Sequence, residues 1–203
     1  ASSGDVVKTL FPLLAALSML PGIALAQPYP TRPIRVIIGF PPGGGIDIVG
    51  RTLAPRLAEV LGQPVVIDNR AGANGIVGTN LAAKSTPDGH TVFLGTIGNL
   101  SVNPLLHAKL PFDVERDFAP VTHVASVASV LMVHPSFPGK TVAELIVAAK
   151  SRPGAINFSS SGNGGAPHLA GELFNLLAGV RLVHVPYQGT SPALIAIVGG
   201  HVQ

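Results

Sequence analysis

The chain has no cysteine, and aromatic and charged residues make up only 5% and 11% of its 203 residues. Without cysteine it can form no disulfide framework, no thiolate metal site and no cysteine nucleophile. Its 13 basic residues are dispersed along the sequence, and the net charge is only +3. Nucleic-acid-binding proteins usually concentrate basic residues in a patch, so we expect no nucleic-acid partner.

The seven histidines are scattered and form neither an HxH nor an HExxH pattern. His168 and Glu172 stand one helical turn apart, but two ligands on one helix do not complete a metal site. A polar contact near a helix start is the simpler interpretation of that pair. The sequence therefore predicts no metal site and no cofactor.

The N-terminus has the pattern of a secretory signal peptide. Lys8 precedes an apolar run, Leu10–Ala26, that ends in small residues before Gln27. A membrane anchor is the alternative, but the run falls short of the roughly 20 residues needed to span a bilayer, and Pro12 and Pro21 interrupt it. We expect residues 1–26 to be a signal peptide, cleaved near Ala26, and the mature protein to be exported to the periplasm.

The rest of the chain repeats one plan, in which a short apolar strand leads through a glycine- or hydroxyl-rich loop into a helix. Alternation of this kind indicates βαβ units and an α/β fold with mainly parallel sheets. The expected strands are Ile34–Phe40, Val65–Ile67, Thr91–Gly95, Val121–Val124, Ser129–Val133, Ile156–Phe158 and Leu182–Val185. The expected helices are Ile46–Leu61, Ile76–Ala83, Val142–Lys150, one starting near Pro167, and one running to Val198 with Ser191 as its N-cap.

The rhythm restarts after Pro120, which suggests two lobes. We place the first lobe at residues 27–123 and the second at residues 124–203. Each lobe would carry a sheet with helices on its faces.

The first loop, Pro41–Gly45, suits an anion. The prolines end the strand, the glycines allow close approach to the backbone, and the next helix directs unpaired N–H groups into that space. A dinucleotide site is a rival, with Asp68 where a ribose-binding acid belongs, but that fingerprint needs glycine or alanine where Ile48 stands. A P-loop fails as well, because Gly45 occupies the lysine position.

Serine hydrolysis is the enzymatic alternative. Ser161 lies in a strand-to-helix turn, His168 or His184 could act as its base, and Asp47 could orient that histidine. The surrounding residues lack the GxSxG pattern typical of such a turn. The sequence thus predicts no complete catalytic set, and we expect the protein not to be an enzyme.

Four loops follow strand ends, where ligands bind in open α/β sheets. They are Gly43–Gly45, Thr96–Asn99, Ser159–Gly165 and Gly189–Ser191. They bring hydroxyls, amides and helix N-termini together. Any one of them could be purely structural, but together they favour a cleft that holds an anion without reacting it.

Several motifs resemble the tripartite tricarboxylate transporter solute receptors, also called the Bug family. They occur in consistent order between about Tyr29 and Gln203: Phe40–Asp47, Asn69–Ala73, Pro87–Thr91, Ser161–Gly164 with His168–Glu172, and His184–Gly189. The resemblance implies a two-lobed periplasmic binding protein of the Venus-flytrap type. Such a protein is a monomer that closes around a small carboxylate and delivers it to membrane permease subunits.

The resemblance also implies a set of ligand-binding residues, which contact the carboxylate through backbone amides, hydroxyls and ordered waters. By position these are Gly43, Gly44, Thr96, Asn99, Ser160, Ser161, Gly164 and His168. The implied ligands are di- or tricarboxylates, amino acids or aromatic acids.

Two features depart from the family. Ala196 stands where members usually have an aspartate, which either alters ligand choice or removes a surface or capping carboxylate. Members are also longer, so we expect this chain to be a C-terminally truncated form with an incomplete second lobe. Such a form would leave a strand edge and apolar core exposed.

Overall fold

The computed structural model describes residues 28–203, so the expected signal peptide lies outside the described residues. Strand β1, Ile34–Ile38, pairs in parallel with β2, Val65–Asn69, and with β3, Thr91–Leu94. The strand order is therefore β2-β1-β3. Ile37 and Ile38 of the central strand are fully buried. A nearly continuous apolar sequence suits such a strand, because both of its faces are covered.

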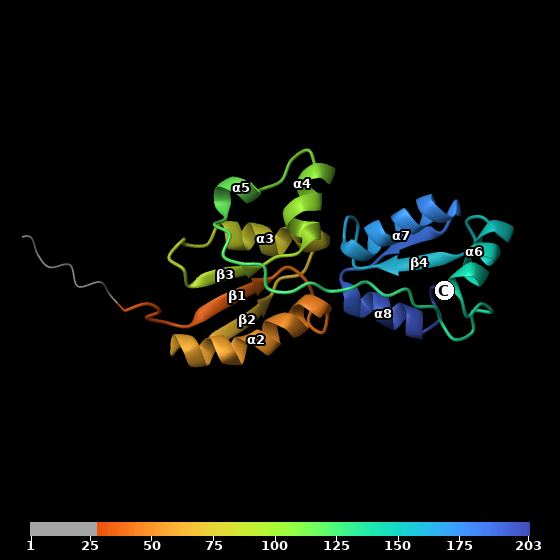
Figure 1. Cartoon of the computed structure of the whole chain (residues 1–203). Helices are drawn as coiled ribbons and strands as arrows, with labels where there is room; N and C mark the ends of the chain where they lie inside the picture. Colours follow the sequence, from red (N-terminus) through yellow and green to blue (C-terminus); the bar gives the residue numbers. More distant parts are fainter. Residues whose placement is uncertain (1–27) are drawn as a thin grey trace, which may run out of the picture. The chain divides into compact units, whose positions relative to one another are not determined.

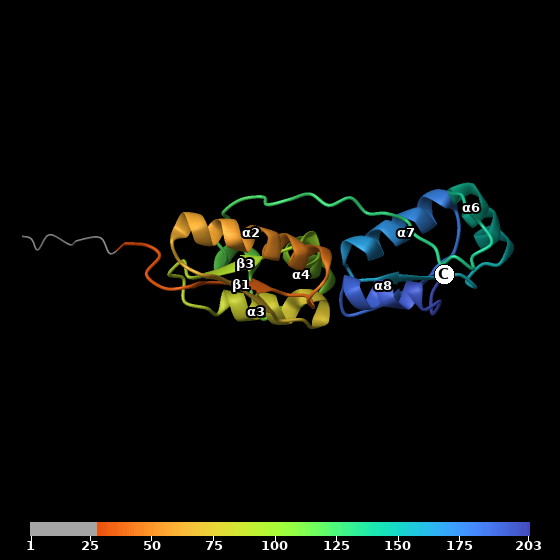
Figure 2. The same cartoon turned by 90° about the horizontal axis from the view of Figure 1, so that it is seen from below.

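Helices cover both faces of this first sheet. Helix α2, Gly45–Leu61, packs on one face, and α3, Ile76–Ala83, packs on the other (Figures 1 and 2). Helix α2 ends at Gly62, which adopts the left-handed conformation that glycine tolerates best. These two helices agree closely with the predicted ranges, and the predicted end at Gly62 is confirmed.

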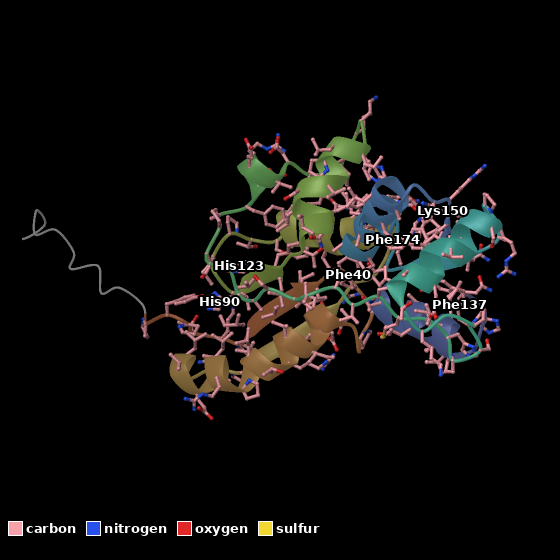
Figure 3. All side chains as sticks on the ribbon, turned by 45° about the vertical axis from the view of Figure 1, so that its right-hand side comes forward. Phe40, His90, His123, Phe137, Lys150 and Phe174 are labelled. Carbon is pink, nitrogen blue, oxygen red and sulfur yellow. The ribbon has the colours of Figure 1, made fainter. Side chains whose placement is uncertain are left out.

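A second sheet contains β4, Asn157–Ser160, and β5, Val183–Pro186, which are also parallel. Helices α7, Ala166–Ala178, and α8, Thr190–Val198, lie on its two faces (Figures 1 and 2). Helix α6, Val142–Ser151, adds Leu145 and Ala149 to the core of this sheet. Phe137 belongs to the same core and Phe174 of α7 packs against it, and Figure 3 labels both. The α/β fold predicted from the sequence is confirmed.

Four short helices complete the described elements, and the sequence pattern predicted none of them. They are η1, Ala73–Gly75; η2, Gly98–Val102; α4, Asn103–Leu106; and α5, Val114–Asp117. The first three follow β2 and β3 and shape the loops at the carboxyl ends of those strands. No helix among the described residues combines the length and apolar character needed to cross a membrane.

The strands predicted at Val121–Val124 and Ser129–Val133 are wrong. This segment is irregular and exposed, with 86% of Val121 and 73% of Val130 accessible to solvent. Its branched apolar residues favour extended backbone, but a strand also needs a neighbour to pair with. Among residues 28–203, no backbone hydrogen bond joins this segment to a strand. The predicted lobe boundary at residue 123 falls within it and stays a prediction.

Two smaller expectations on α8 need correction. The helix is capped by Gly189, and Ser191 is an interior residue whose hydroxyl donates to the carbonyl of Pro42 at 3.0 Å. Ser191 thus joins two loops and does not cap its own helix. Ala196 is 97% buried in α8, since only 3% of it is exposed. A carboxylate at this position would not lie on the surface, so the surface interpretation of that departure loses its support, while the capping and ligand-choice interpretations stay predictions.

Candidate functional site

Four loops at the carboxyl ends of strands meet in one region. We call them the proline-glycine loop (residues 39–45, after β1), the asparagine loop (72–75, after β2), the serine loop (159–165, around the end of β4) and the glutamine loop (187–189, after β5). A Cβ added to Gly189 would lie 2.6 Å from Cδ of Pro41, and one added to Gly162 would lie 3.4 Å from Oδ1 of Asn74. The close approach at Gly189 and the positive φ of both residues, 120° at Gly189 and 130° at Gly162, explain why glycine occupies these positions.

A small cavity lies among these loops. Nine residues line it, none of them charged: Gly39, Phe40, Pro41, Gly72, Ala73, Asn74, Gly75, Ser161 and Gln188. Its volume is about 10 Å³, close to the minimum for one water molecule. A larger ligand can therefore enter only if the loops move apart.

The buried carboxylate of Asp47 holds the proline-glycine loop by hydrogen bonding. It is 2% exposed, and its carboxylate accepts hydrogen bonds of 2.9 Å from the Gly43 amide, Arg51 Nε and Asn69 Nδ2. Burial alone would raise the pKa of Asp47, but the hydrogen bonds from Arg51, Gly43 and Asn69 and the charge of Arg51 outweigh it and lower the pKa. Asp47 is thus ionised at neutral pH. It holds the loop and is not available to orient a histidine.

Asn74 of the asparagine loop lies close to two further asparagines, Asn99 and Asn103. Asn74 has a left-handed backbone with φ of 50°, and its Nδ2 donates to Oδ1 of Asn103 at 3.0 Å. Asn103 in turn donates to the backbone carbonyl of Asn74 at 3.1 Å. Oδ1 of Asn74 and Nδ2 of Asn99 are buried without a hydrogen-bond partner among the described residues. Unpaired buried groups are costly, so these two atoms suit contact with a water or ligand.

The two serines of the serine loop have different roles. Ser160 is 1% exposed, and its hydroxyl accepts from the Gly162 amide at 3.1 Å and contacts Nε2 of His184 at 2.6 Å. Ser161 lines the cavity, and within residues 28–203 its hydroxyl makes no hydrogen bond to another residue. Ser160 therefore shapes the loop, whereas Ser161 is the serine that lines the cavity.

The enzymatic alternative required Ser161 beside a histidine. Instead, Nδ1 of His168 accepts a 3.0 Å hydrogen bond from the Gly164 amide, and its Nε2 lies 3.8 Å from Glu172. The serine that does contact a histidine, Ser160, is buried and bound to the loop backbone. This geometry does not favour a hydrolase.

The structure brings only part of the predicted ligand set to the cavity. Ser161 lines it, and Asn99 lies behind Gly39 and Gly75, two of its lining residues. The amides of Gly43 and Gly164 are already bonded to side chains. Gly44 caps α2, and Thr96 bonds to Asn99 through its amide at 2.7 Å. The role of these residues in ligand binding stays a prediction.

Sequence reasoning missed Asn74 and Gln188. Gln188 lies within the motif His184–Gly189 that carried the resemblance, whereas Asn74 lies one residue beyond the motif Asn69–Ala73. The sequence signal for Asn74 was an asparagine between two glycine positions, a pattern that tolerates left-handed backbone. Its contact with the serine loop depends on tertiary structure.

The nucleotide alternative also loses its acidic residue. The carboxylate of Asp68 pairs with the guanidinium groups of Arg35 and Arg70. Burial would raise its pKa, but hydrogen bonds from both arginines outweigh that effect and lower it. A carboxylate held by two guanidiniums is poorly placed to bind a ribose. Within residues 28–203, no group of three or more His, Asp or Glu side chains could hold a metal ion.

Comparison with known proteins identifies one family of receptors. Residues 49–203 match the family described as tripartite tricarboxylate transporter family receptor. The chain is 42% identical over 178 residues to Protein BugT of Bordetella pertussis, covering 87% of this chain and 55% of that protein.

Two solved structures carry a named ligand. The structure of R. palustris Rpa4515 with adipate is 38% identical, with a TM-score of 0.84 over 86% of this chain and 58% of that chain. The structure of MatC from Rhodopseudomonas palustris with bound malate is 33% identical, with a TM-score of 0.78 over 86% of this chain and 59% of that chain. The present chain thus spans less than two thirds of the length of these relatives.

Proposed function

Because the chain belongs to the tripartite tricarboxylate transporter receptor family, we propose that it captures a small carboxylate in the periplasm and delivers it to the membrane subunits of such a transporter. Solved relatives are described as a periplasmic transporter and a periplasmic binding protein. The export-type N-terminal segment agrees with that location. We further propose that the receptor acts as a monomer.

The uncharged lining of the cavity is the observation that best supports this function. It offers the hydroxyl of Ser161, the side chains of Asn74 and Gln188, and the backbone of two glycine-rich loops. Amides and hydroxyls can hold a carboxylate by hydrogen bonds without a basic side chain, as anion sites at helix N-termini and in backbone nests do. Such a site contains no nucleophile–base pair, so it binds the ligand and releases it unchanged.

The size of the cavity suggests how binding would proceed. With room for about one water molecule, the four loops must separate to admit a dicarboxylate. A ligand that contacts loops from both sheets would then favour the arrangement in which those loops are close. Its differential affinity for that arrangement would supply the free energy of closure.

Calorimetry with matched ligands tests the proposal. Adipate and malate are the first candidates, with citrate, glutamate and benzoate to cover the wider classes. Hexanoate is the matched control for adipate, because it has the same chain length and lacks one carboxylate. We expect heat of binding and a raised melting temperature with at least one di- or tricarboxylate, and a much weaker response to hexanoate.

Variants then locate the site. Ser161→Ala should weaken binding by roughly 2- to 10-fold, the effect of one lost hydrogen bond. Ser151→Ala is the matched control, because Ser151 is an exposed serine at the end of α6. If no carboxylate binds, or if turnover of a ligand is detected and lost in Ser161→Ala, the receptor proposal is wrong.

A further inference from the structure

Two histidines, whose rings stack on each other, contact the serine loop. His168 comes from the first turn of α7, and His184 from the middle of β5. Their ring centroids are 3.9 Å apart with an interplanar angle of 26°. The sequence predicted His168 as a ligand-binding residue and gave His184 no such role, yet each contacts the loop that carries Ser161.

Each imidazole is connected to one backbone amide of the loop. Nδ1 of His168 accepts the Gly164 N–H directly at 3.0 Å, which requires that this nitrogen carry no proton. Nε2 of His184 contacts the Ser160 hydroxyl at 2.6 Å, and the same hydroxyl accepts the Gly162 N–H at 3.1 Å. The pair therefore holds the loop on both sides of Asn163.

Few other groups face the pair. From α7, Glu172 Oε1 lies 3.8 Å from Nε2 of His168, the nitrogen that carries the proton in the neutral ring, and its negative charge favours the charged ring. From β4, the neighbours are uncharged: the Phe158 ring at 5.0 Å from the His184 ring, and Ser160. Two stacked imidazoles cannot both be charged without strong repulsion, and Glu172 can offset only part of it.

We propose that His168 and His184 are positioning residues, which hold the serine loop in its ligand-binding geometry only while Nδ1 of His168 is unprotonated. Protonation of that nitrogen turns the acceptor of the Gly164 amide into a donor, so the two N–H groups oppose each other and the loop is released. The consequence for ligand rests on the proposed function: a carboxylate at Ser161 would bind more weakly once that nitrogen is protonated.

The surroundings of His184 agree with this behaviour. Burial, followed by the nearby His168, lowers the pKa of His184, while Glu172 acts in the opposite direction. The folded state therefore favours neutral His184. The stability that it contributes is complete above the ordinary histidine pKa of about 6.5, and it is lost as the pH falls through the lower pKa of the folded state.

The loop itself provides a readout that needs no ligand. In ¹⁵N-labelled chain, the amide resonances of Gly162 and Gly164 are followed between about pH 8 and about pH 5, the range in which histidine titrates. We expect the Gly164 resonance to move with a single midpoint. In His168→Gln it should stay still, because the glutamine oxygen can accept the same hydrogen bond without titrating. His123→Gln, at an exposed position, should behave like the parent chain.

Affinity for adipate, or for whichever carboxylate binds best, is measured over the same pH range. It should fall about 2- to 10-fold in the parent chain, as expected for one lost hydrogen bond, and stay constant in His168→Gln. His184→Gln gives a second test: because His168 is intact in this variant, the Gly164 resonance should still move with pH. If the Gly164 resonance titrates equally in His168→Gln, the positioning role is refuted. If it titrates as expected but no carboxylate binds at neutral pH, the receptor function fails and the positioning role stands.

Discussion

Replacing Asp47 by alanine is the sharpest test of how the proline-glycine loop is held. The substitution removes the acceptor for the Gly43 amide, Arg51 and Asn69, which all lie at 2.9 Å from the carboxylate. Breaking a fully buried ion pair costs about 3–5 kcal/mol. Arg51 is about half exposed and can turn to solvent, and Asn69 keeps its 3.0 Å hydrogen bond to the Phe40 carbonyl, whereas the Gly43 amide loses its acceptor. We therefore expect a loss of about 2–4 kcal/mol in unfolding free energy.

Urea denaturation followed by circular dichroism measures this loss. With an m-value of about 2 kcal/mol/M, the midpoint should fall by about 1–2 M. Glu59→Ala is the matched control, because Glu59 lies on the same helix and pairs with Arg56 on the exposed surface. Surface pairs of this kind contribute at most about 1 kcal/mol. If Asp47→Ala and Glu59→Ala unfold at the same urea concentration, the carboxylate does not hold the loop.

The pH dependence of the same difference provides a second check. The pKa of Asp47 is lowered in the folded state, so the unfolded state binds its proton more readily. The stability from Asp47 is therefore complete above the unfolded pKa of about 3.9 and is lost as the pH falls through the lower folded value. The two proteins should differ fully at pH 7 and converge in strong acid. A difference that grows on acidification would contradict the assignment.

Two further comparisons use matched substitutions. Ser160→Ala should lower the free energy of unfolding by about 1–3 kcal/mol, because it leaves a buried amide of the serine loop without an acceptor. Ser161→Ala should change the free energy of unfolding little. Equal losses in urea denaturation would contradict the separate roles of the two serines. Gly78→Ala should cost about 1–3 kcal/mol, because its Cβ would lie 2.7 Å from Cα of Gly39. At Gly45, which begins helix α2, an added Cβ would meet nothing within 4 Å, so Gly45→Ala should leave the free energy of unfolding unchanged or raise it by up to about 1 kcal/mol. A comparable loss of stability in both variants would show that the contact at Gly78 is not the cause.

Local patterns predicted most of the regular structure. Helix α3 has the predicted range, Ile76–Ala83, and α2 begins one residue before the predicted start and ends as predicted at Leu61. These elements depend on apolar spacing and on glycine at helix ends, which are properties of adjacent residues. The same rules failed at Val121–Val124 and Ser129–Val133. Those residues have strand propensity, but a strand forms only beside a partner, and propensity does not reveal whether one is present.

The candidate site shows the same division. The sequence alone determined an α/β fold with glycine-rich loops at strand ends, because the period of apolar residues and the positions of glycine and proline are local properties. It also located the serine loop and the region of the proline-glycine loop. Only the tertiary structure decided which groups are available to a ligand. It showed that the Gly43 and Gly164 amides and the Ser160 hydroxyl are already bonded, while Ser161 faces the cavity. Hydrogen-bond partners come from residues far apart in sequence, so their pairing is fixed only when the sheets and helices pack together.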